Sequence, residues 1–172
     1  MSEFLHDRYL AGLVDGEGSF LIRKVSRRSS YHVMMQLGLR LDSGFVLKEL
    51  AGVFGGSLSV YEIRGGANPD HKPLIRWAVV GKQDVLRLIA YFDEFGLVVK
   101  GAEYEVWREA ALLYYRYAVG TGGGKTPDWL MSAMESAKTE LERLKKYDAQ
   151  GAEFFIKKSS KQLELFGDAD AI

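Results

Sequence analysis

The sequence predicts an α+β protein in which helices cover one face of an antiparallel sheet. Apolar residues recur with the period of a helix in some stretches and alternate with polar residues in others. The two types of stretch follow one another as helix, strand, strand, helix, strand, strand, and further helices come after them. Antiparallel strand pairs alternating with helices are typical of a sheet with one covered face. The other face must therefore meet water or a ligand.

Each expected element has a local reason. Large apolar residues among small ones favour a helix at 6–16, and Gly16 and Gly18 then interrupt the chain. The next two alternating stretches are joined by Ser29-Ser30, a link short enough for a hairpin. Gly55-Gly56 ends the second helix, and Pro127 starts the last one. We expect strands at residues 19–28, 31–41, 57–64 and 73–80, and helices at 6–16, 44–54, 82–95, 102–119 and 126–147.

Composition narrows the class of protein. With 172 residues, 47% hydrophobic and 27% charged, the chain is expected to form one globular domain over 1–172, with a core at about 6–118 and a C-terminal helix and tail at about 126–172. The chain has no cysteine, which excludes disulfide scaffolds, thiolate zinc sites and cysteine nucleophiles. No apolar run approaches the roughly 20 residues of a membrane span. Residues 1–7 do not resemble a signal peptide, so an intracellular location, in cytoplasm or an organelle matrix, is expected.

Charge is distributed unevenly along a neutral chain. Lys+Arg and Asp+Glu both number 23. The expected first hairpin, residues 18–41, nevertheless carries five basic residues and no acidic one, whereas residues 93–109 carry five acidic and two basic ones. A neutral protein with one basic face can bind DNA with a marked salt dependence. The composition therefore requires that any nucleic-acid surface be local.

The most specific motif lies in residues 9–20, which read Tyr-Leu-Ala-Gly-Leu-Val-Asp-Gly-Glu-Gly-Ser-Phe. Glycine inside a helix costs about 1 kcal/mol relative to alanine, and a close approach by a second helix is a good reason for that cost. Glu17 falls at the end of the expected helix, where the helix dipole is unfavourable for a carboxylate. A Mg²⁺ ion held by Glu17 and the carbonyl of Gly16 would offset this repulsion.

The string LAGLVDGEG at residues 10–18 resembles the signature of the LAGLIDADG homing endonuclease family, and the order of elements over about residues 6–118 fits that family. The resemblance implies a LAGLIDADG-type αββαββα core with an antiparallel four-stranded DNA-binding sheet, plus C-terminal helices. It also implies a homodimer, because one motif per chain supplies one set of carboxylates and two DNA strands need two. The motif helices would meet on the two-fold axis through Leu10, Ala11, Gly12, Leu13 and Gly16.

The implied activity is that of a site-specific double-strand DNA endonuclease of the intron-homing type that uses Mg²⁺, with Ca²⁺ or Mn²⁺ as substitutes for binding or activity. Glu17 is the expected catalytic and metal-binding residue, one methylene longer than the commoner aspartate, and Gly16 is the second metal ligand. Lys100 would polarise the scissile phosphate or hold the attacking water; a solvated lysine at a helix start is the competing interpretation. Arg40 would join the water network of the site or contact a phosphate.

Strand alternation selects the residues that would contact DNA. If Leu58, Val60, Ile75, Trp77 and Val79 face the core, their neighbours face outward. Arginine and glutamine suit guanine and adenine edges, while other cations position the backbone. The expected base readers are Arg23, Arg27, Gln36, Tyr61 and Arg76, and the expected phosphate contacts are Lys24, Arg28, Arg64 and Lys72, with Arg40 as a further candidate.

Two other functions remain open on the same scaffold. One is an intron maturase, for which intron RNA would be the partner. The other is a DNA-binding regulator that does not cut. Glu17 and Lys100 favour cleavage over a maturase role alone, and the two activities can also coexist. Such regulators usually carry an additional helix-turn-helix module, and the last fifty residues show no clear one.

Overall fold

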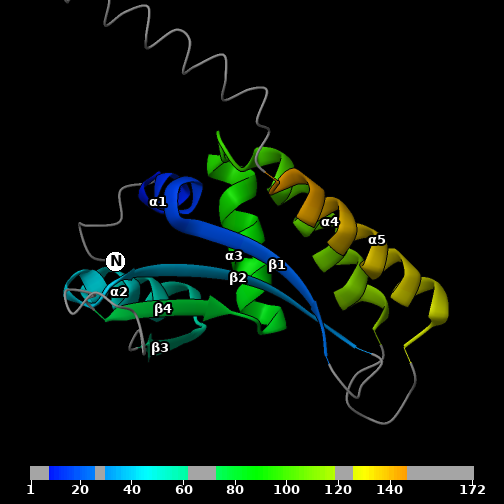
Figure 1. Ribbon diagram of the computed structural model, residues 1–172, viewed down its shortest axis with the longest axis horizontal. Helices are drawn as coiled ribbons and strands as arrows, with labels where there is room; N and C mark the ends of the chain where they lie inside the picture. The colour runs from blue at the N-terminus through cyan, green and yellow to red at the C-terminus, as the bar shows by residue number, and fades with distance from the viewer. Residues whose placement is uncertain (1–7, 26–29, 62–72, 119–125, 147–172) are drawn as a thin grey trace, which may run out of the picture.

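The computed structural model describes residues 8–25, 30–61, 73–118 and 126–146, and over these the chain forms a mixed α/β fold (Figure 1). The 3-10 helix η1 (Leu41–Ser43) joins the second strand to the second helix. The strands are β1 (Gly18–Lys24), β2 (Tyr31–Arg40), β3 (Ser57–Tyr61) and β4 (Leu74–Val79). The helices are α1 (Tyr9–Glu17), α2 (Gly44–Phe54), α3 (Lys82–Phe95), α4 (Gly101–Tyr117) and α5 (Asp128–Leu144).

The four strands form one antiparallel sheet in the order β1-β2-β4-β3. Gly18 pairs with Leu37 at one end of β1, and Lys24 pairs with Tyr31 at the other. Successive side chains of a strand point to opposite faces, so this register places two sets of residues on two faces. One face carries the buried side chains of Phe20, Ile22, Val33, Met35, Leu37, Ile75, Trp77 and Val79. The opposite face, called the open face below, carries Ser19, Arg23, Gln36, Ser59, Tyr61 and Arg76.

All five described helices contribute to a single core against the buried face. Figure 1 shows α4 and α5 side by side beyond α3, with α1 above the start of β1. Phe20 of β1 lies at the centre of this core, with its ring 6.0 Å from Phe92 of α3 and 5.0 Å from Trp107 of α4. Each such fully buried side chain stabilises the fold by roughly 1.5–3 kcal/mol. No described helix packs a core against the open face, so that face of the sheet is available to a ligand.

Two glycines are required where elements meet closely. Helix α1 passes directly into β1, and a Cβ on Gly18 would lie 2.7 Å from both Cγ1 and the carbonyl oxygen of Val14. Helix α2 ends at Gly55, which has a φ of 81° that favours glycine. Gly56 then donates its N–H to Asp84 at 3.0 Å, and the Trp77 indole donates to the Gly55 carbonyl at 2.8 Å. These contacts fix the entry into β3.

The expected α+β class and element order are confirmed, with ends that differ by a few residues. The expectation that Leu58 and Val60 are core residues is wrong. They point to the same face as Ile75 and Trp77, but β3 is an edge strand, and 38% of Leu58 and 55% of Val60 stay exposed. In the described part of the chain, no helix combines the length and apolar character needed to cross a membrane.

Candidate active site and nucleic-acid interface

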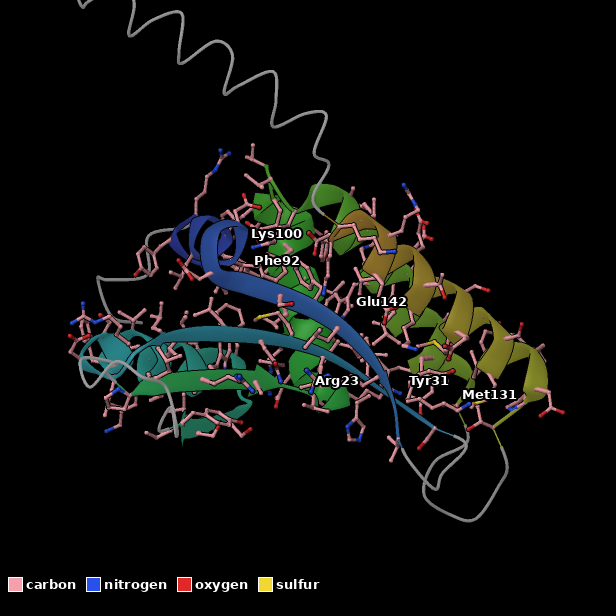
Figure 2. All side chains as sticks on the ribbon, in the orientation of Figure 1. Arg23, Tyr31, Phe92, Lys100, Met131 and Glu142 are labelled. Carbon is pink, nitrogen blue, oxygen red and sulfur yellow. The ribbon has the colours of Figure 1, made fainter. Side chains whose placement is uncertain are left out.

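The end of α1 brings Glu17 and Lys100 together. Glu17 is the last residue of the helix and is exposed, and the described residues provide no partner for its carboxylate. The partly buried Lys100 Nζ donates to the carbonyls of Val14 at 3.0 Å, Asp15 at 2.9 Å and Gly16 at 3.4 Å. Figure 2 shows Lys100 beside the end of α1. An ammonium group at the negative end of a helix offsets the dipole that opposes a carboxylate there, so Lys100 supplies part of the cationic balance that the sequence assigned to a metal alone.

Asp15 holds the loop that carries Lys100. Its carboxylate accepts hydrogen bonds from the backbone N–H groups of Val98 at 2.8 Å, Val99 at 3.1 Å and Lys100 at 2.9 Å. These N–H groups directly precede α4, so the carboxylate of one helix holds the segment that leads into another. Sequence reasoning assigned no role to Asp15, although it lies within the motif.

The helices on either side of this loop are fastened to each other. The Tyr104 hydroxyl of α4 donates to Asp93 of α3 at 2.6 Å and to the Ile89 carbonyl at 3.1 Å, and Arg108 forms an ion pair with Asp93 at 2.7 Å. The hydrogen bond from Arg108 lowers the pKa of Asp93, while burial and the neighbouring carboxylate raise the pKa of Tyr104. Lys100 therefore lies in a connection between two helices that are joined by side-chain contacts.

The donor set at this end of α1 suits a hard divalent cation. Glu17 offers an uncommitted carboxylate, and the adjacent Gly16 is exposed. Mg²⁺ is typically bound by one or two carboxylates together with water and substrate phosphates. No group of three or more acidic, histidine or cysteine residues suited to a metal occurs in the described residues. One chain therefore offers part of the donor set of a divalent-cation site.

The open face carries predicted DNA-contacting residues from different strands. Arg23 of β1, Gln36 of β2 and Arg76 of β4 point to it, as does Tyr61 of β3. The guanidinium of Arg76 lies 4.3 Å from the centre of the Tyr61 ring. A hydrogen bond with Ser59 and the positive charge of Arg76 lower the pKa of Tyr61. No acidic residue occurs in any of the four described strands, so this face suits a polyanion.

Other predicted contact residues are placed differently. Arg40 forms an exposed ion pair with Asp42, and its role in the site remains a prediction. Lys24 points to the helix-covered face of β1, close enough to Glu135 of α5 to lower the pKa of that carboxyl. Arg27, Arg28, Arg64 and Lys72 lie outside the described residues.

The exposed stripe of α1 differs from the predicted interface. The assignment of Leu10 and Ala11 to a dimer contact is wrong, because both are buried within their own subunit, with 1% and 5% of their surfaces exposed. Gly12 and Gly16 are exposed, and a Cβ on either would meet nothing within 4 Å. The surface available to a second helix consists of Gly12, Leu13, Gly16 and Tyr9, the last of which the sequence analysis did not select.

The fold and site combine a four-stranded antiparallel sheet that has an open face without acidic residues with an exposed carboxylate at the end of the motif helix. Residues 10–111 match the family model described as "LAGLIDADG endonuclease", and the chain belongs to this family. No curated protein sequence matches the chain.

Several solved structures are similar to the chain in fold. I-SmaMI bound to cleaved DNA is 17% identical to this chain, with a TM-score of 0.64. The match covers 83% of this chain and 45% of the I-SmaMI chain. I-SmaMI bound to uncleaved DNA with calcium ions is 18% identical with a TM-score of 0.62, covering 85% and 47%. I-AabMI bound to uncleaved DNA is 20% identical with a TM-score of 0.59, covering 78% and 44%. The chain therefore spans less than half the length of these proteins.

Proposed function

We propose that the protein is a site-specific double-strand DNA endonuclease that acts as a homodimer with Mg²⁺. The observation that carries this proposal is that the end of α1 carries both the uncommitted Glu17 carboxylate and the Lys100 ammonium, beside a strand surface without acidic residues. Membership in the LAGLIDADG endonuclease family supports the same activity. The calcium ions in one I-SmaMI complex with DNA are consistent with a divalent cation.

Each residue of the site has a distinct task in phosphodiester hydrolysis. Glu17, with the Gly16 carbonyl, would hold the cation, which when bound would stabilise negative charge on the phosphate and favour deprotonation of water. Lys100 stabilises the charge that develops on the phosphate oxygens, because its ammonium lies next to Gly16. Asp15 fixes Lys100 through the backbone and takes no proton in the reaction.

Dimerisation follows from the requirement for two cuts. One chain provides a single Glu17 at the end of a single motif helix, and each DNA strand requires such a carboxylate. The open space at Gly12 and Gly16 would let two copies of α1 approach closely, which brings their two Glu17 residues near the two-fold axis.

The open face would read the sequence of the target. A sheet can enter the major groove as β-ribbon readers do, and Arg23, Gln36 and Arg76 would then reach base edges. Two copies related by a two-fold axis would read two half-sites, so the target is expected to be long and partly palindromic.

A selection of cleaved sites from a randomised duplex library, carried out in Mg²⁺ and repeated for binding in Ca²⁺, tests the proposal. The expected result is one enriched, partly palindromic sequence that is cut in both strands only with Mg²⁺. Binding without cutting under every divalent cation would overturn the endonuclease proposal. Selective binding of structured RNA in place of any duplex would favour the maturase alternative.

A further inference from the structure

A second lysine reaches the same site from the C-terminal helix. Lys145 directly follows α5, and its Nζ donates to the Ser19 hydroxyl at 3.2 Å and to the Phe20 carbonyl. Ser19 and Phe20 are the second and third residues of β1, so this contact begins two residues after Glu17. The family match ends at residue 111, so α5 and Lys145 lie beyond the part of the chain that it covers.

Lys100 and Lys145 flank Glu17 along the backbone. Lys100 holds carbonyls of the last turn of α1, immediately before Glu17, and Lys145 holds the start of β1, immediately after it. The two ammonium groups influence each other electrostatically. Along the backbone, Glu17 thus lies between two segments that are each held by a lysine from a distant part of the sequence.

The ammonium of Lys145 lies at the edge of the open face. Ser19 pairs with Gln36 and points to the same face as Arg23. Loss of hydrating water against the strand lowers the pKa of Lys145, and the positive charges of Lys100 and Arg23 act in the same direction. Glu103 and Glu142 oppose this shift and favour the charged form. A phosphate at this position would restore to the ammonium the solvation that the strand removes.

The hydrogen-bonding capacity of the two lysines differs. An ammonium group has three donors. In the described residues Lys100 has three carbonyl acceptors, whereas Lys145 has two, the Ser19 hydroxyl and the Phe20 carbonyl. Lys145 therefore keeps one donor for an oxygen of a ligand.

We propose that Lys145 binds a backbone phosphate of the DNA strand whose scissile bond lies at Glu17, so that the C-terminal helix contributes a positioning cation to the site. The inference rests on the proposed function and adds a residue to it. Lys145 would hold the strand in register next to the scissile phosphate through its free donor. Lys100, whose donors are directed to three backbone carbonyls, would act on that phosphate through its positive charge.

The test compares Lys145→Met, Lys145→Gln and Lys145→Arg with the matched control Lys146→Met, which removes the same charge one residue away. The duplex is the one selected from the randomised library, and its binding is measured in Ca²⁺ over a series of salt concentrations. Each phosphate contact contributes about 0.9 to the slope of log affinity against log salt. We expect Lys145→Met and Lys145→Gln to flatten this slope by about 0.9 per protomer, and Lys145→Arg and Lys146→Met to retain the parental slope.

A purely structural role for Lys145 predicts a different result. If Lys145 only fastens α5 to β1, thermal stability and affinity fall in Lys145→Met while the salt slope stays parental, and the proposal is overturned. Lys145→Gln decides the question if Lys145→Met does not fold, because its amide can still donate a hydrogen bond but carries no charge. A parent protein that binds no duplex overturns both proposals. If the parent binds and cuts, a parental salt slope in Lys145→Met and Lys145→Gln overturns this proposal alone.

Discussion

The side chains of Lys100 and Asp15 each form a hydrogen bond with the backbone of the other residue. The Lys100 ammonium donates to the Asp15 carbonyl at 2.9 Å, while the Lys100 backbone N–H donates to the Asp15 carboxylate at 2.9 Å. The motif helix therefore sets the position of the cation that acts beside its own last residue. The two acidic residues of the motif therefore differ. The Asp15 carboxylate is occupied by backbone hydrogen bonds, whereas the Glu17 carboxylate has no partner in the described residues.

Replacing Asp15 by alanine is expected to damage both stability and cleavage. The change leaves three backbone N–H groups without their acceptor, which should lower the free energy of unfolding by about 2 kcal/mol. The released loop displaces Lys100, which should slow cleavage of the selected duplex by roughly 10²-fold. Urea unfolding and single-turnover cleavage measure the two effects, with the exposed Glu49→Ala as control. Cleavage at the parental rate would show that Lys100 is placed by other contacts.

Glu17→Gln is expected to abolish Mg²⁺-dependent double-strand cleavage and to leave DNA binding largely intact. The amide keeps the size of the side chain but loses the charge that holds the cation, so cleavage should fall by roughly 10³-fold or more. Stability should change little, because the carboxylate has no partner in the described residues. Cleavage and gel-shift assays in Mg²⁺ and Ca²⁺ check this, with the exposed Glu94→Gln of α3 as the matched control. A variant that cuts as well as the parent would remove Glu17 from the catalytic assignment.

The stability of the fold should depend on pH through the contact between β2 and α5. The Tyr31 hydroxyl donates to Glu135 at 2.6 Å, which lowers the pKa of Glu135, and burial raises the pKa of Tyr31 to about 12. The contact contributes fully to the free energy of unfolding between pH 4.5 and pH 10.0, the ordinary pKa values of the two groups. Below this range the contribution is lost as Glu135 becomes protonated. Above it the contribution is lost toward pH 12, as Tyr31 becomes deprotonated.

Tyr31→Phe removes this contact and is expected to cost about 1–2 kcal/mol at neutral pH. The free energies of unfolding of the parent and the variant should converge as the pH falls through the lowered pKa of Glu135. Urea unfolding at several pH values measures this convergence. Tyr117→Phe serves as the control, because that tyrosine is exposed at the far end of α4. A difference that stays constant from pH 3 to pH 8 would contradict the assignment to the Tyr31–Glu135 pair.

The sequence predicted what depends on local periodicity and on the motif. Alternation placed Arg23, Gln36 and Arg76 on one face, because a strand fixes side-chain direction without reference to its neighbours. It could not predict that Val60 stays exposed, because exposure depends on the position of β3 at the edge of the sheet. The contacts of Asp15 and Lys145 were also out of reach, because they join residues more than 80 positions apart in the sequence.

Gly12→Leu is expected to separate dimerisation from folding. Gly12 lies on the exposed stripe of α1, and a Cβ there meets nothing within 4 Å, so leucine fits the monomer and should favour the helix by about 1 kcal/mol. In a close α1–α1 contact the same side chain would keep the two backbones apart. We therefore expect a variant that is at least as stable as the parent but sediments as a monomer at micromolar concentration and does not make double-strand cuts. Gly52→Leu is the matched control, because Gly52 of α2 is also exposed with nothing within 4 Å. Sedimentation of Gly12→Leu as a dimer would exclude this face of α1 as the interface, since the larger side chain could not be accommodated there.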